Sequence, residues 1–191
     1  MTIDPTAARL AGAGVAYAPE IASAARRHGL DPTLLAAVAA QETGGPGANA
    51  GRNVVGDGGH GHGLFQIDDR WHAFAKTAAA MDPAKNADYA AGMLSGLLDQ
   101  YGGNLRSALS AYNSGSAGGA PAYAQSVLEH YSEIAGGAVA ELPSLVNSLG
   151  ALASQAQSLP NMPSTPMQQQ PQTYHRQATD YSGLFDDTPD A

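Results

Sequence analysis

The segment that decides the expected fold reads Asp31-Pro32-Thr33-Leu34-Leu35-Ala36-Ala37-Val38-Ala39-Ala40-Gln41-Glu42. Asp31 is a typical N-cap residue, because its carboxylate can accept a hydrogen bond from a free backbone N–H of the first turn. Pro32 suits the first helical position, where no N–H is needed. Residues 44–46 read Gly-Gly-Pro, a sequence that ends helices. The segment therefore predicts a helix that ends close to Glu42.

The position of Glu42 on that helix indicates a possible catalytic carboxyl. Leu35, Val38 and Glu42 are spaced three and four residues apart, so they share one helical face, which we expect to be buried. Burial raises the pKa of a carboxyl, and a carboxyl still protonated near neutral pH can act as a general acid. From the helix alone an equal alternative stays open, in which Glu42 is a helix-end residue that turns into water.

Further helices are expected on both sides of this segment. Tyr89 and Met93 belong to an apolar stripe that repeats every four residues, which favours a helix packed on the core. No alternating pattern of convincing strand length appears. The expected helices cover residues 19–28 (closed by Gly29), 70–76 (a short turn), 86–101, 105–113 (capped by Asn104) and 121–131 (opened by Pro121).

Three short motifs follow Glu42 in a recognisable order. They are Gly63-Leu64-Phe65-Gln66, then Ala111-Tyr112-Asn113-Ser114-Gly115, then Tyr123 with Val127 four residues later. Together with Glu42, they resemble goose-type lysozymes and the related soluble lytic transglycosylases over residues 17–132. The resemblance implies a mainly α, α+β lysozyme-like fold. It also implies a small Gly-rich loop or a two- or three-stranded sheet within residues 51–68.

The resemblance also implies a reaction, the cleavage of the β-1,4 bond between N-acetylmuramic acid and N-acetylglucosamine in peptidoglycan. Glu42 matches the general acid. Asp57 and Asp68 match the aspartates thought to activate water in goose-type enzymes, whereas a lytic transglycosylase needs no water and leaves 1,6-anhydro ends. Both aspartates also have ordinary interpretations, since Asp57 lies between two glycines of a turn and Asp68 could cap a helix starting at Asp69.

Four more residues match substrate-binding positions of the family: Gln66, Tyr112, Asn113 and Tyr123. No cofactor is implied. His60 and His62 form a His-Gly-His pair, but two histidines without further ligands are a weak metal motif, so no metal is expected. The competing function is a non-catalytic virion or scaffold protein that keeps a sugar-binding groove.

The composition of the chain excludes several classes of partner and location. The net charge is −8, whereas a protein that binds nucleic acid needs a basic surface, so nucleic acid is not an expected partner. Cysteine is absent, so the fold needs no disulfide. Residues 1–14 lack the basic and apolar regions of a signal peptide, and no run is long enough to span a membrane. An enzyme acting on the cell wall would therefore need another route, such as phage entry, phage lysis from the host cytoplasm as an endolysin, or secretion as an effector.

The chain divides into four expected parts. An N-terminal arm covers residues 1–16 and the catalytic domain 17–132. An Ala- and Leu-rich helical extension covers 133–159, and a Pro- and Gln-rich acidic tail covers 160–191. Catalysis on a glycan requires neither of the last two parts. We therefore expect residues 133–191 to bind other virion proteins of a phage.

Overall fold

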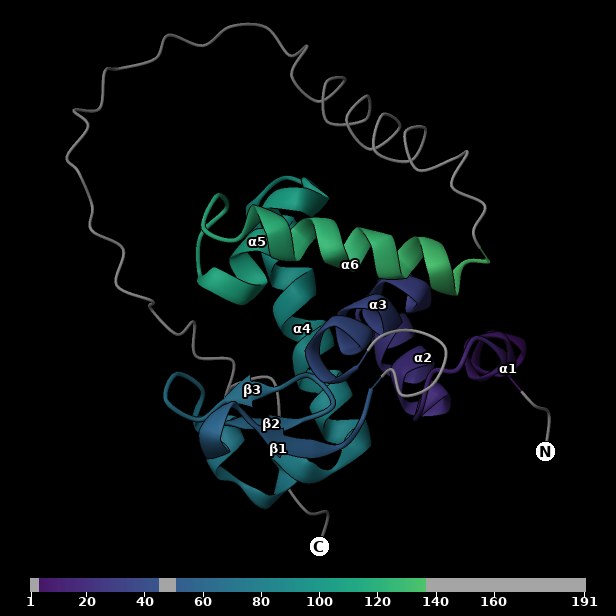
Figure 1. Ribbon diagram of the computed structural model, residues 1–191, viewed down its shortest axis with the longest axis horizontal. Coiled ribbons are helices and arrows are strands. Elements are labelled where there is room, and N and C mark those ends of the chain that lie inside the picture. The colour runs from purple at the N-terminus through teal and green to yellow at the C-terminus, as the bar shows by residue number, and fades with distance from the viewer. Residues whose placement is uncertain (1–3, 45–50, 137–191) are drawn as a thin grey trace, which may run out of the picture.

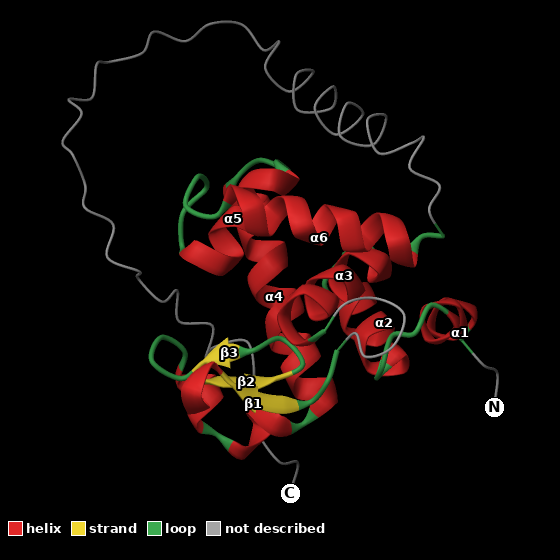
Figure 2. Ribbon diagram, viewed as in Figure 1, coloured by secondary structure: helices red, strands yellow, loops and turns green. Residues whose placement is uncertain are grey.

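The structure, a computed structural model, describes residues 4–44 and 51–136. In this part of the chain, helices surround one central helix and a small sheet lies at one end (Figures 1 and 2). The predicted fold class, mainly α with a small β segment, is confirmed. The helices are α1 Pro5–Gly12, α2 Ala18–Arg27, α3 Pro32–Thr43, α4 Pro83–Gln100, α5 Leu105–Ser114 and α6 Pro121–Ile134. The strands are β1 Val54–Gly56, β2 Gly61–Gly63 and β3 Ile67–Asp68, and short 3-10 turns cover Asp57–Gly59, Ala73–Lys76 and Ala78–Met81.

Side-chain caps set the starts of four helices, α1, α3, α4 and α5. The Asp31 carboxylate accepts a hydrogen bond from the backbone N–H of Thr33 at 2.8 Å, and Asn104 caps α5 through the N–H of Ser107. Both caps confirm the sequence prediction. Helix α4 begins at Pro83, three residues before the predicted start, because the Asp82 side chain accepts from the first free N–H groups.

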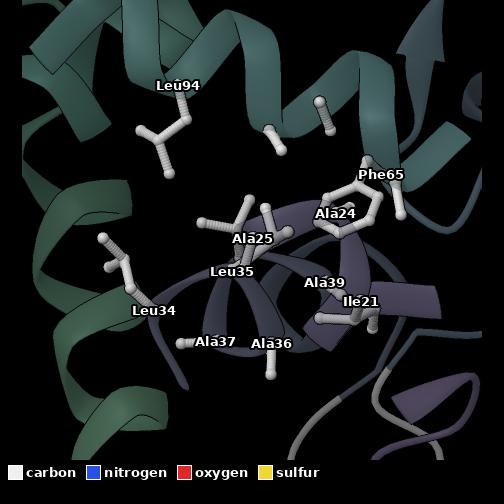
Figure 3. Close-up of a cluster of buried hydrophobic side chains, with 14 of the residues drawn as sticks. Ile21, Ala24, Ala25, Leu34, Leu35, Ala36, Ala37, Ala39, Phe65 and Leu94 are labelled. Atoms are coloured by element: carbon white, nitrogen blue, oxygen red, sulfur yellow. The ribbon is translucent and has the colours of Figure 1, made fainter. Parts of the chain in front are cut away.

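Helix α3 is buried on all sides, which corrects the expectation of a single buried face. Every residue from Thr33 to Ala40 is buried. Figure 3 shows its leucine and alanine side chains among those of Ile21 and Ala24 from α2, Leu94 from α4, and Phe65. The alanines allow this packing, since small side chains let neighbouring helices approach closely from several directions. Helix α3 is therefore the centre of the core and ends at Glu42 and Thr43.

The N-terminal segment packs onto this core. Leu10 of α1 is fully buried, and Arg9 donates a hydrogen bond from its guanidinium to the Thr33 hydroxyl at 2.7 Å. Asp4 caps α1 and pairs with Arg26 of α2. The described part of the predicted N-terminal arm is thus a helix in contact with α2 and α3.

Helix α6 continues three residues beyond its predicted end. Ile134 is buried, and the Tyr131 hydroxyl donates a hydrogen bond to the Asp31 carboxylate at 2.8 Å. These contacts hold α6 along α3. Apart from residues 133–136, the predicted extension and tail lie outside the described residues. Within the described ranges, no helix is both long and apolar enough to cross a membrane.

The small sheet predicted within residues 51–68 is present. Its strands are antiparallel in the order β1-β2-β3, with Val55 opposite His62 and His62 opposite Ile67. The Gln66 side chain lies over the sheet, where a Cβ atom on Gly56 or Gly61 would collide with its amide oxygen. Glycine at these two positions is therefore required for the close approach of Gln66.

A buried side chain, Asn86 of α4, holds the sheet against the helices. Its amide oxygen accepts a hydrogen bond from the N–H of Phe65 at 3.0 Å. Its amide nitrogen donates to the carbonyls of His62 and Ala80 at 3.1 and 3.0 Å. Because the strands are only two or three residues long, these bonds contribute much of what fixes the segment from β2 to β3.

We predict that Asn86→Ala lowers the free energy of unfolding by about 2–4 kcal/mol, because buried backbone groups lose their partners. Urea unfolding of the two proteins measures the difference. Lys85→Ala, at the exposed neighbouring position of α4, is the control and should change stability by less than about 0.5 kcal/mol. Equal losses in both variants would contradict the anchoring role.

Candidate active site

A cavity of about 390 Å³ opens where the end of α3, the sheet and helices α4 and α5 meet. Six of the sequence-predicted site residues line it: Glu42, Asp57, Gln66, Asp68, Tyr112 and Asn113. The other lining residues are Phe65, Ile67, Arg70, Trp71, His72 and Met93. Tyr123, the remaining predicted site residue, is not part of the lining.

Glu42 is the carboxyl that the fold perturbs most clearly. Burial at the end of α3 raises its pKa from 4.5 to about 7, because a carboxylate loses its hydration there. A hydrogen bond donated by the Tyr123 hydroxyl to Oε1, 2.6 Å long, acts in the opposite direction and lowers the pKa. Burial is the larger effect, so a substantial fraction of Glu42 is protonated near neutral pH.

Two tyrosines enclose this carboxyl. The rings of Tyr112 and Tyr123 are stacked, with centroids 6.4 Å apart. Burial and the charge of Glu42 raise the pKa of both phenols well above 10, so both keep their protons. The Tyr112 hydroxyl is buried and has no hydrogen-bond partner among the described residues. A buried hydroxyl without a partner costs free energy.

Asp57 and Asp68 share one cation, Arg70. The guanidinium of Arg70 donates to both oxygens of Asp68, with Nε 2.9 Å from Oδ1, and it also pairs with Asp57. The two aspartates, 11 residues apart in the sequence, are thereby held on one wall of the cavity. Asp68 also accepts a hydrogen bond from the N–H of Arg70. No helix begins at Asp69, so the alternative that Asp68 caps one is wrong; Asp68 ends strand β3 and stabilises a turn.

Gln66 is bound by the sheet on which it lies. Its amide nitrogen donates to the carbonyls of Val54 and Gly63 at 3.0 and 2.9 Å, and its backbone has φ +46°. The amide therefore has the partners that a partly buried Gln requires. Asn113 is exposed on α5 at the cavity edge. The substrate-binding roles of these residues stay predictions.

His60 and His62 both contact Asp69, with nitrogen–oxygen distances of 2.8 and 3.3 Å. The hydrogen bond to His60 is the main reason why the pKa of Asp69 is lowered. Over residues 4–44 and 51–136, no group of three or more His, Cys, Asp or Glu side chains is arranged to hold a metal ion. None of these three residues lines the cavity.

Half of the cavity residues that sequence reasoning missed come from one segment, Arg70-Trp71-His72. The sequence alone placed this segment in a short helical turn. One signal was available, because Arg70 follows two consecutive aspartates and a cation so close to acidic residues often pairs with one of them. The second pairing, to Asp57, requires the chain to fold back 13 residues, and no periodicity indicates that.

The raised pKa of Glu42 predicts a pH-dependent stability. Because the folded-state pKa is the higher one, wild-type protein should lose stability relative to Glu42→Gln as the pH rises from about 4.5 through about 7. The loss should level off near 3 kcal/mol, at about 1.4 kcal/mol per pKa unit. Urea unfolding of both proteins from about pH 4 to about pH 9, a range that includes both pKa values, measures this difference in stability. Glu129→Gln, an exposed glutamate of α6, controls for loss of a carboxyl as such. A constant difference between wild type and Glu42→Gln would contradict the burial effect.

Comparison with known proteins agrees with this geometry. No solved structure shows a significant match to the chain. The transglycosylase SLT domain family, whose members act on peptidoglycan, matches residues 19–126, more than half of the chain. The matched range includes Glu42, both tyrosines and every residue that lines the cavity. The chain therefore belongs to the transglycosylase SLT domain family, with the mainly helical, lysozyme-like fold described above.

Proposed function

We propose that this protein cleaves the β-1,4 bond between N-acetylmuramic acid and N-acetylglucosamine by lytic transglycosylation, with Glu42 as acid and then as base. The observation that carries the proposal is the buried Glu42 carboxyl, with a pKa of about 7, in the wall of a 390 Å³ cavity. A pKa close to the working pH lets one group first give and then take a proton.

In the first step, the protonated Glu42 carboxyl transfers its proton to the glycosidic oxygen. The bond from that oxygen to C1 of the muramic acid breaks, and positive charge develops at C1 and the ring oxygen. The N-acetylglucosamine side leaves as an alcohol. The newly formed Glu42 carboxylate is stabilised by the hydrogen bond from Tyr123, and its negative charge favours the cationic sugar.

In the second step, the Glu42 carboxylate removes the proton from the C6 hydroxyl of the same muramic acid. The C6 oxygen bonds to C1 and closes a 1,6-anhydro ring, and Glu42 is protonated again. No water is consumed, so a second carboxylate is not needed.

The ion pair between Arg70 and Asp68 favours this route over goose-type hydrolysis. A general base must have a free lone pair for the proton that it takes from water. Arg70 donates to both oxygens of Asp68 but to only one oxygen of Asp57, so Asp68 in particular would act as a base in competition with a charge-assisted hydrogen bond. Hydrolysis remains the second candidate, because both aspartates line the same cavity as Glu42.

We further propose that the enzyme acts on the cell wall as part of a phage virion, anchored through residues 137–191. The support for this comes from composition alone, which is Pro- and Gln-rich and then acidic. The family match ends at residue 126, α6 ends at Ile134, and the described residues that line the cavity all come before that segment.

We expect Glu42→Gln to reduce the release of fragments from purified peptidoglycan by about two to four orders of magnitude, as for loss of a general acid. Wild-type products should carry 1,6-anhydromuramic ends, as read by mass spectrometry. Asp57→Asn and Asp68→Asn should give the same product type. Circular dichroism provides the check that the variants are folded.

Three outcomes would contradict the proposal. Comparable activity of a folded Glu42→Gln variant removes Glu42 as the acid. If the wild-type products carry reducing muramyl ends, and one aspartate variant no longer forms them, the mechanism is hydrolytic. The absence of fragments from wild-type protein favours a non-catalytic virion or scaffold protein that only binds the glycan.

Truncation after Gly136 tests the anchoring proposal. This end point keeps Ile134, which is buried, and Tyr131, which bonds to Asp31. The shortened protein should digest purified peptidoglycan at the wild-type rate but should no longer copurify with phage particles. Normal incorporation of the truncated protein would overturn the anchoring role, and loss of digestion would show that the removed residues support the catalytic domain.

A further inference from the structure

We propose that Trp71 is a sugar-stacking platform at the cavity, whose indole face binds one pyranose ring of the N-acetylated glycan strand. The inference rests on the proposed function, because the glycan strand that contacts Trp71 is the strand that is cleaved at Glu42. None of the family motifs in the sequence includes Trp71, and nothing in its local pattern distinguishes it from a surface residue.

The exposure of Trp71 is the first observation. It is the only tryptophan of the chain, and 40% of its surface is exposed. Among the described residues, the other exposed large apolar side chains are Tyr17, Val54 and Val55, and none of these lines the cavity. Trp71 thus combines a large exposed aromatic surface with a place in the cavity wall. An aromatic side chain that lines a pocket contributes most to binding when the ligand can bury its exposed surface.

The backbone of Trp71 is fixed, which is the second observation. The carbonyl of Asp68 accepts hydrogen bonds from the N–H groups of both Trp71 and His72, at 3.2 and 2.9 Å. This places Trp71 inside a tight turn directly after strand β3. A binding residue held in this way loses less conformational entropy when the ligand arrives.

Both neighbours of Trp71 are also anchored through their side chains. Arg70 is paired with Asp57 and Asp68. The His72 ring lies 3.1 Å from the Tyr89 hydroxyl and contacts the Tyr89 ring edge-on. In this arrangement Arg70 is a positioning residue, and its two ion pairs hold the turn that presents the indole to the cavity.

The ligand chemistry follows from the shape of the two partners. A pyranose has a flat face of C–H groups, and an indole offers a large apolar surface of matching size. Stacking of this kind does not read the lactyl group that distinguishes muramic acid from N-acetylglucosamine. The platform should therefore bind a plain chain of β-1,4-linked N-acetylglucosamine, which provides a soluble probe.

The single tryptophan makes a direct test possible. Glu42→Gln protein, which binds without cleaving, is titrated with the N-acetylglucosamine hexamer while indole fluorescence is recorded. We expect a saturable blue shift, because the sugar removes water from the indole face. By calorimetry, Trp71→Ala in the same background should weaken binding about tenfold or more, as for loss of a central aromatic contact. Trp71→Phe should recover part of that loss.

Kinetics with purified peptidoglycan separate a platform from a general structural role. In otherwise wild-type protein, Trp71→Ala should raise KM more than it lowers kcat, since the residue binds the strand and does not touch the reacting atoms. Val55→Ala, an exposed apolar residue of β1 outside the cavity, is the matched control and should leave both constants unchanged.

The outcomes are distinguishable from failure of the proposed function. Calorimetric binding of the hexamer without any change in indole emission, or unchanged binding by Trp71→Ala, would overturn the platform even if the enzyme cleaves peptidoglycan. A saturable emission shift in a wild-type protein that releases no fragments would support the platform and overturn the proposed catalysis. A Trp71→Ala variant that loses kcat while its KM stays unchanged would also overturn the platform.

Discussion

The burial of one carboxyl group, opposed by one hydrogen bond, is the constraint on which this site depends. Desolvation raises the pKa of Glu42 to about 7, and the Tyr123 hydroxyl limits the shift. Both effects exist because α3 runs through the centre of the core and ends at the cavity. On an exposed face of a helix Glu42 would stay hydrated, and its pKa would stay near that of an ordinary glutamate.

Arg70 changes how the two aspartates of the cavity are interpreted. Considered separately, Asp57 and Asp68 could each activate a water molecule. Paired with one guanidinium, they form a compact charge cluster whose attractive energy is available only while both carboxylates remain ionised and in place. The cluster therefore holds both carboxylates on the cavity wall.

The sheet that forms part of this wall is too small to be stable alone, since strands of two or three residues make few ladder hydrogen bonds. Side chains supply the missing contacts. Gln66 binds the carbonyls of Val54 and Gly63, Asn86 binds the segment from β2 to β3, and the Thr43 hydroxyl donates to the carbonyl of Leu64 at 3.2 Å. The last bond links the helix end that carries Glu42 directly to the connection between β2 and β3.

The small sheet, and the way the motifs come together in one site, were implied only by the resemblance to a family. The sequence by itself determined the local features, which are the caps at Asp31 and Asn104 and the start of α6 at Pro121. These follow from neighbours within a few residues, where propensity and hydrogen-bond chemistry decide. Only the tertiary structure decided that α3 is buried on every side, that Arg70 joins Asp57 to Asp68, that Tyr123 reaches Glu42 across 81 residues, and that Trp71 faces the cavity. Such contacts join segments far apart in the chain, and a periodic pattern records which face is apolar but not which partner will cover it.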